Sequence, residues 1–310
     1  MPDTQKPHWT ESRRSGRLAR VRSRAGVEMT GLHAPADGQA PLLLCLHGLS
    51  GNLGTSFVVD FLSAPELEGV HLLTVESSAH GNIAMARRGD PPRYSLGGSA
   101  FEIFDECIGD LAAWVDYAAS KTRGPIILLG HSLGAAKVVR YQAETADPRV
   151  RGLVLASAAD LKGAFWAMHG DASATRFMDE ARAMLRRGEG RALMGEDCVV
   201  GLLKQRISAA TFIDRFEDGK PSDVFDFFGR GSIRAFDDLA KVTLPLLALY
   251  GSSGEIVGDG DVARALSLLE QRAARCPAFS SAIVPGNHWY LGSEPLVAQT
   301  IAAWLAGLAS

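Results

Sequence analysis

Long apolar runs are missing from this chain of 310 residues. No stretch of about eighteen uninterrupted apolar residues exists, so the sequence predicts no membrane-spanning helix. The first 24 residues lack the apolar segment of a secretory signal and instead carry seven basic residues against two acidic ones. We therefore expect a cytoplasmic protein in which residues 1–16 form a polar basic tail, open to a contact with lipid or nucleic acid.

Net charge and cysteine content are also low. The formal net charge of −3 favours neither nucleic acid nor a membrane surface as the main partner. The four cysteines are scattered and form neither a C-x-x-C pair nor a zinc-type pairing with histidine. The sequence thus predicts reduced thiols and no metal site.

Short apolar runs typical of buried strands alternate with stretches of helical periodicity. In residues 101–120, apolar side chains recur on one face at three- and four-residue spacing. The strand-like runs are 42–48, 70–77, 125–132, 152–160, 245–255 and 280–288, preceded by two expected edge strands in 17–24 and 27–35. This alternation predicts an α/β fold with a mostly parallel sheet covered by helices on both faces, built from residues 17–160 and 242–310.

Residues 161–241 interrupt this alternation. The interval has a helical pattern, contains no convincing buried strand and holds nine aromatic residues. We predict a helical cap that is inserted between two late strands and packs over one end of the sheet. Two roles stay open for its aromatic residues: an apolar wall for substrate, with Phe165 and Trp166 as candidates, or the cap's own core.

Residues 125–142, PIILLGHSLGAAKVVRYQ, place a serine between a strand and a helix. So tight a turn forces Ser132 toward positive φ and leaves room only for small neighbours, which explains Gly130 and Gly134. The hydroxyl is then lifted clear at the carboxyl ends of the strands, where ligands bind in such folds. The N–H of Leu133, at the helix N-terminus, is free to donate to a developing oxyanion. The spacing G-x-S-x-G therefore predicts a nucleophilic serine.

In this context the motif G-H-S-L-G resembles the nucleophile elbow of the α/β-hydrolase superfamily, serine esterase type, from residue 42 to the C-terminus. Residues 87–102 and 105–118 are similar to bacterial α/β-hydrolases of unassigned substrate and, more distantly, to fungal siderophore esterases. The resemblance implies a Ser–acid–His triad in that chain order and calls for no metal, nucleotide or flavin cofactor.

The resemblance also implies partners for the serine. His47-Gly48 resembles the family's HG turn, so the N–H of Leu49 is expected as a second oxyanion donor; we place His47 and Gly48 at the substrate and expect His47 to hold this loop. A serine hydroxyl needs a base that works near neutral pH, for which imidazole is suited. Of the eight histidines, His288 alone lies late in the chain just after a buried strand, where the family carries its catalytic histidine.

The acid is where the sequence departs from the family pattern. Related enzymes read G-x-x-D after the late strand, whereas here Gly251 is followed by Ser-Ser-Gly and then Glu255. Glu255 is the first candidate, because a longer side chain can reach the imidazole from a shifted position. Asp160 stays open, since some members take the acid from the earlier strand, and Asp259 and Asp261 lie in the same loop as Glu255.

Together these features predict a serine hydrolase that cleaves a carboxylic ester, a thioester or a lactone through an acyl-enzyme. The expected substrate is a small molecule with an apolar portion, and a homo-oligomer is left open. One alternative within the same fold is cleavage of an amide or a C–C bond. The other is a catalytically silent binding protein on a hydrolase scaffold, which the missing aspartate at Gly254 favours.

Overall fold

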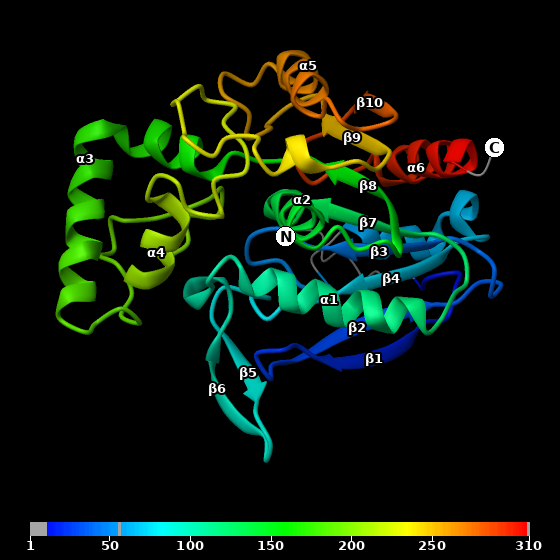
Figure 1. The fold of residues 1–310 in the computed structure, drawn as a ribbon, viewed down its shortest axis with the longest axis horizontal. Helices are drawn as coiled ribbons and strands as arrows, with labels where there is room; N and C mark the ends of the chain where they lie inside the picture. Colours follow the sequence, from blue (N-terminus) through cyan, green and yellow to red (C-terminus); the bar gives the residue numbers. More distant parts are fainter. Residues whose placement is uncertain (1–10, 55–56, 309–310) are drawn as a thin grey trace, which may run out of the picture.

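A computed structural model of the chain describes residues 11–54 and 57–308. Its centre is an eight-stranded sheet in the order β1-β2-β4-β3-β7-β8-β9-β10 (Figure 1). The strands are β1 (Arg17–Arg22), β2 (Glu28–Ala34), β3 (Leu42–Leu46), β4 (His71–Val75), β7 (Ile126–His131), β8 (Val150–Ala156), β9 (Leu246–Gly251) and β10 (Phe279–Val284). From β4 to β10 every neighbouring pair is parallel, whereas β2 runs antiparallel to both of its neighbours. The prediction of a mostly parallel sheet is therefore confirmed.

Helices cover both faces of this sheet (Figure 1). One face packs against α1 (Glu106–Ala119), α2 (Leu133–Thr145) and α5 (Val262–Arg272). The other face packs against α6 (Glu294–Leu308) and two short 3₁₀ segments, Phe57–Ser63 and Pro65–Leu67. Because side chains of a strand alternate between faces and both faces are covered, all five residues of β3 are apolar and buried. No helix in the described ranges is long and apolar enough to cross a membrane.

The expected basic tail is only partly described, since residues 1–10 lie outside the described residues. Arg14, near its end, is fixed to the body of the protein. Its guanidinium donates to the carbonyl oxygens of Leu67 and Val70 at 2.9 and 3.0 Å. Within the expected tail, Arg14 is therefore anchored to the protein.

The inserted segment builds a cap from α3 (Leu161–Arg186), which is kinked at Gly170, and α4 (Ala209–Phe216). Figure 1 places both helices beside the end of the sheet at which α2 and α3 begin. Their aromatic residues form a separate core, in which the rings of Phe165 and Phe216 stack with centroids 4.5 Å apart. Residues 224–239 instead return to the main core. Within the interval 161–241, α3 and α4 thus share a core of their own, and residues 224–239 belong to the main core.

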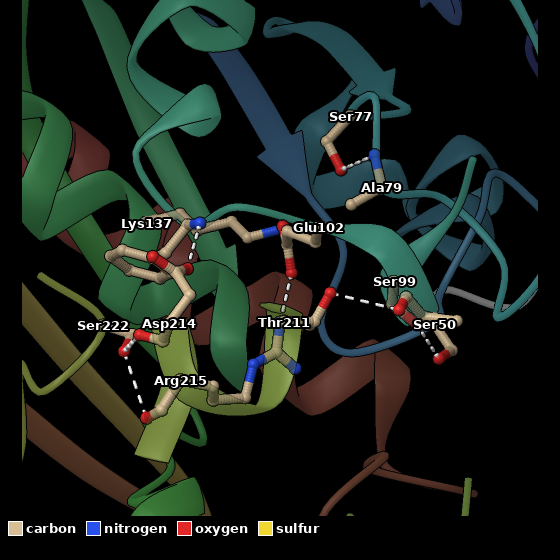
Figure 2. A network of polar contacts seen from close by, with 12 residues as sticks. Ser50, Ser77, Ala79, Ser99, Glu102, Lys137, Thr211, Asp214, Arg215 and Ser222 are labelled. Atoms are coloured by element: carbon tan, nitrogen blue, oxygen red, sulfur yellow. Dashed lines mark hydrogen bonds and ion pairs between the residues drawn. The ribbon is translucent and has the colours of Figure 1, made fainter. Parts of the chain in front are cut away.

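A buried charge network joins the cap to the core (Figure 2). The carboxylate of Glu102, just before α1, forms ion pairs with Lys137 of α2 and Arg215 of α4. All three residues are buried, with exposed fractions of 4 % for Glu102, 1 % for Lys137 and 3 % for Arg215. Beside them Asp214 accepts the Phe104 N–H at 2.6 Å. The position of α4 on the core is therefore fixed by charge as well as by packing.

Residues 84–97 form an antiparallel hairpin outside the main sheet, β5 (Ala84–Arg88) with β6 (Arg93–Gly97). This stretch is not among the strand-like runs predicted from the sequence. The side chains of Met85, Tyr94 and Leu96 are mostly exposed, so these strands lack the apolar pattern by which buried strands are predicted from sequence. Figure 1 shows the hairpin projecting from the body of the protein.

Candidate active site

Ser132 occupies a single-residue junction between β7 and α2. Its backbone has φ 56° and ψ −120°, a left-handed conformation that is costly for a residue with a Cβ. The flanking glycines are sterically required. A Cβ at Gly130 would overlap the Gly134 carbonyl, and a Cβ at Gly134 would lie 2.6 Å from the His47 carbonyl oxygen. Strand, helix and the His47 loop thus come too close for any larger residue.

His288 faces this serine from the loop between β10 and α6. Its Nε2 lies 2.9 Å from Ser132 Oγ, and both residues are buried. The backbone of the loop is held by His131, whose Nε2 donates to the His288 carbonyl oxygen at 2.8 Å. Burial and the neighbouring His288 lower the pKa of His131 to about 3, so this imidazole is neutral and carries its proton on Nε2.

The acid that reaches His288 is Glu255. Its Oε2 lies 2.8 Å from His288 Nδ1, and its Oε1 accepts the Gly251 N–H at 2.6 Å. The side chain is fully buried. The backbone explains the shifted position, because Gly254 has φ 67° and follows two exposed serines. Glycine adopts this positive φ without the cost that a Cβ imposes, and Glu255, directly after it, bonds back to Gly251 at the end of β9.

The three other candidate acids have different partners. Asp160 caps the N-terminus of α3 by accepting the Gly163 N–H at 2.6 Å, and burial raises its pKa to about 6. Asp261 caps α5, and Asp259 forms an exposed ion pair with an arginine of that helix. None of these contacts involves His288, so within the described residues only Glu255 reaches the imidazole.

The two predicted oxyanion donors, Leu133 and Leu49, belong to the chain segments next to Ser132. Leu133 is the first residue of α2, where an amide has no partner inside the helix. Leu49 follows Gly48, at which a Cβ would lie 2.8 Å from Ser132 Cβ. Ser50 holds this loop through a 2.5 Å contact with Ser99 Oγ (Figure 2). That the Leu49 and Leu133 amides form an oxyanion hole stays a prediction from the resemblance.

His47 is hydrogen-bonded through both ring nitrogens to the backbone around it. Its Nδ1 donates to the Gly48 carbonyl oxygen at 2.8 Å, and its Nε2 accepts the Ser77 N–H at 3.2 Å. Burial lowers its pKa to about 4, so the ring is neutral. These bonds use both ring nitrogens and hold the loop, as the sequence analysis expected.

A cavity of about 130 Å³ opens onto Ser132 and His288. Its walls include His47 and Gly48, the apolar residues Leu161, Ile256 and Trp289, and a tight turn of the cap at residues 201–205. Phe165 and Trp166, expected at the substrate, are not among the lining residues. Phe165 is buried in the core of the cap and Trp166 packs against that core, because α3 turns this face toward α4.

A turn of the cap that was not predicted from the sequence lines the cavity. Val200 and Gln205 pair across it, and Gly201 has φ 69°. Leu202 and Leu203, at its tip, remain 46 and 69 % exposed. The available signal was an apolar pair directly after a glycine, in a stretch without helical period.

Among the described residues, no group of His, Cys, Asp or Glu side chains is placed to hold a metal ion.

Comparisons with known proteins agree with this architecture. The model of the alpha/beta hydrolase family matches residues 43–299. The structure of the siderophore hydrolase EstB from Aspergillus fumigatus superposes with a TM-score of 0.66 and 17 % identity, covering 97 % of this chain and 100 % of its own. Est1E from Butyrivibrio proteoclasticus gives a TM-score of 0.59 and 16 % identity, covering 95 % of this chain and 99 % of its own. At these identities the two structures show a common fold.

A curated relative matches over a shorter segment. Phospholipase YtpA from Bacillus subtilis (strain 168) is 24 % identical over 123 residues, which are 39 % of this chain. The match spans 42 % of the length of that phospholipase, less than half of it.

Proposed function

The chain belongs to the alpha/beta hydrolase family, and we propose that it is a serine hydrolase that cleaves carboxylic esters. The observation that carries the proposal is the relay from Ser132 Oγ to His288 Nε2, at 2.9 Å, and from His288 Nδ1 to Glu255 Oε2, at 2.8 Å. Nucleophile, base and acid are buried and within hydrogen-bond distance of one another, as a Ser–His–acid triad requires. A siderophore hydrolase among the structural neighbours is consistent with a hydrolytic reaction.

The first half of the reaction forms an acyl-enzyme. Ser132 Oγ attacks the carbonyl carbon of the ester while its proton passes to His288 Nε2. Glu255 stabilises the resulting imidazolium through Nδ1. The carbonyl oxygen becomes an oxyanion and accepts the N–H groups of Leu49 and Leu133. When this intermediate collapses, the imidazolium gives its proton to the alcohol oxygen, which leaves.

The second half releases the acid. His288 takes a proton from water, and the hydroxide oxygen bonds to the acyl carbon through a second oxyanion in the same place. Collapse breaks the bond to Ser132 Oγ, which recovers its proton from His288. The carboxylic acid departs and the resting relay is restored, without any cofactor.

The cavity supports a substrate with an uncharged, apolar portion. Apart from the neutral histidines and the triad, the residues that line it in the described part of the chain carry no ionisable side chain. Its volume of about 130 Å³ exceeds by several-fold the 10–15 Å³ that one water requires, so a small apolar group fits. Thioesters and lactones present the same carbonyl to Ser132 and belong to the same proposal.

Labelling with a fluorophosphonate probe tests the function. Wild-type protein should be labelled within minutes on the peptide that carries Ser132, as mapped by mass spectrometry, and Ser132→Ala should not be labelled. Ser23→Ala is the matched control, because Ser23 is also buried but lies in the β1–β2 turn. The same proteins are then assayed on a panel of esters, thioesters and lactones. Folded wild-type protein that neither labels nor turns over any ester would contradict the proposal and favour a binding protein.

A further inference from the structure

Two residues beside Glu255 have strained backbones. Ser157, the first residue after β8, has φ 49°, and Tyr290, two residues after His288, has φ 57°. Neither is a glycine, and each such conformation costs about 1 kcal/mol or more. Both side chains are fully buried. Strain of this kind persists where the surrounding contacts enforce it, and here those contacts converge on the carboxylate.

The contacts form a short chain of hydroxyl groups. Ser157 Oγ lies 2.8 Å from Glu255 Oε1 and 2.8 Å from the Tyr290 hydroxyl. The Tyr290 hydroxyl also donates to the Leu249 carbonyl oxygen at 3.0 Å. The two hydroxyl groups hold two protons, and both the carboxylate and the carbonyl can only accept. The hydroxyl of Ser157 therefore donates toward Glu255 and the Tyr290 oxygen, while the Tyr290 hydroxyl donates to Leu249.

The tyrosine is built to act as a donor. Burial and the charge of Glu255 raise its pKa well above the ordinary value, so it keeps its proton. Its ring packs edge-on against Phe57, with centroids 5.0 Å apart, and its N–H donates to the Asn287 carbonyl oxygen at 2.8 Å. Ring and backbone thus fix the hydroxyl beside Ser157.

We propose that Ser157 and Tyr290 are positioning residues that enable a glutamate one place beyond the usual acid position to serve the triad. Ser157 holds Oε1 of Glu255, so that Oε2 points at His288 Nδ1. Tyr290 orients the Ser157 hydroxyl and ties this contact to the histidine loop. A glutamate has one more rotatable bond than an aspartate, so without these donors its carboxylate has more orientations to occupy. This inference rests on the proposed function.

Ser157→Ala and Ser157→Gly test the role of the hydroxyl. Both should lower kcat by about 10- to 100-fold, the effect of one hydrogen bond to a charged group, with KM within about twofold of wild type. The imidazolium loses its aligned partner, so the acid limb of the pH profile of kcat/KM should move to lower pH. Glycine tolerates positive φ, so Ser157→Gly should melt no lower than Ser157→Ala while losing the same activity. If the two variants lose the same activity although Ser157→Gly is the more stable, the loss comes from the missing hydroxyl group and not from a weakened fold.

A double-mutant cycle with Glu255→Gln tests whether Ser157 acts through the acid. Once the carboxylate is gone, Ser157→Ala should cost less than about twofold in kcat, because the two residues act as one unit. Tyr290→Phe keeps the ring and should lower kcat by about 3- to 10-fold in the wild-type background alone. The matched controls Ser23→Ala and Tyr141→Phe remove buried hydroxyl groups far from the site and should leave kcat unchanged.

Two outcomes would overturn the inference. One is wild-type kcat and an unmoved acid limb in both Ser157 variants. The other is the same fold-loss from Ser157→Ala with and without Glu255. Fluorophosphonate labelling of the wild type distinguishes these results from failure of the proposed function. If the wild type is labelled and active but the Ser157 variants keep its activity, only the positioning role is refuted.

Discussion

Replacing Glu102 by Gln should destabilise the protein strongly, because it removes the only carboxylate that Lys137 and Arg215 contact in the described ion pairs. Lys137 and Arg215 are 1 and 3 % exposed, so neither ammonium nor guanidinium gains water in exchange. Burial acts to raise the pKa of Glu102, but the two cations lower it more, and the net pKa lies below the ordinary value of 4.5. In the variant both cations stay buried without a countercharge.

The magnitude follows from the burial. Removing one partner of a buried ion pair typically costs about 3–5 kcal/mol, out of a total stability of about 5–15 kcal/mol. An unfolding entropy of about 2.1 cal/mol/K per residue makes 1 kcal/mol equivalent to about 1.5 °C for a chain of 310 residues. The melting temperature of Glu102→Gln should therefore fall by about 5–8 °C. Replacing all three residues by Leu, Met and Met should recover most of the loss, since two nitrogen atoms of Arg215 have no partner within the described residues.

Thermal and urea unfolding, followed by circular dichroism between pH 3 and pH 8, measure both size and sign. A carboxyl whose folded pKa is lowered stabilises the protein above its unfolded pKa, and this contribution is lost as the pH falls through the folded value. The gap between wild type and Glu102→Gln should thus be full above pH 4.5 and narrow below it. Glu144→Gln is the control, since Glu144 pairs with Arg140 but is 52 % exposed, and it should cost less than about 1 kcal/mol. A gap below about 1 kcal/mol at pH 7, or one that does not change with pH, would refute the reasoning.

Two further predictions concern the acid candidates and the cavity. Burial raises the pKa of Asp160 to about 6, so the free energy of unfolding of the wild type should fall by up to about 3 kcal/mol as the pH rises from 4 to 6. In urea unfolding, Asp160→Asn should flatten this pH dependence, and the variant should keep ester hydrolysis. Loss of activity would instead point to Asp160, and not Glu255, as the acid of the triad. Changing Leu202 and Leu203 to Ser should lower kcat/KM about 10-fold more for octanoate than for acetate p-nitrophenyl esters; equal losses for both would mean that the turn does not contact the acyl chain.

The sequence was sufficient where steric rules leave few choices. A serine between two glycines, directly after an apolar strand and before a helix, predicts the junction at Ser132, and the structure has it. The late histidine was found by topology, because the carboxyl ends of β7 and β10 lie at the same edge of one parallel sheet. Both predictions depend on backbone geometry, which short-range sequence patterns report well.

The cap was predicted less well, because its sequence pattern does not show how its helices dock on the rest of the protein. Phe165 has helical spacing and an apolar side chain, which suits a substrate wall and a buried core equally. The structure turns it toward Phe216 and leaves the cavity to Leu202 and Leu203 in a non-periodic turn. Which face of an amphipathic helix meets the substrate depends on how the helix docks, and that depends on contacts such as Glu102 with Arg215 that no local pattern encodes.

The acid required a different kind of information. Chain position and side-chain length put Glu255 first, but they left Asp160, Asp259 and Asp261 open. What distinguishes Glu255 is a set of donors from three separate segments: Gly251 from β9, Ser157 after β8 and, through it, Tyr290 from the histidine loop. Like Ser132, both Ser157 and Tyr290 have positive φ. Unlike Ser132, neither is flanked by glycines from which such a conformation could be predicted. Serine and tyrosine in these positions look ordinary, so the residues that select the acid become recognisable only once the strands are side by side.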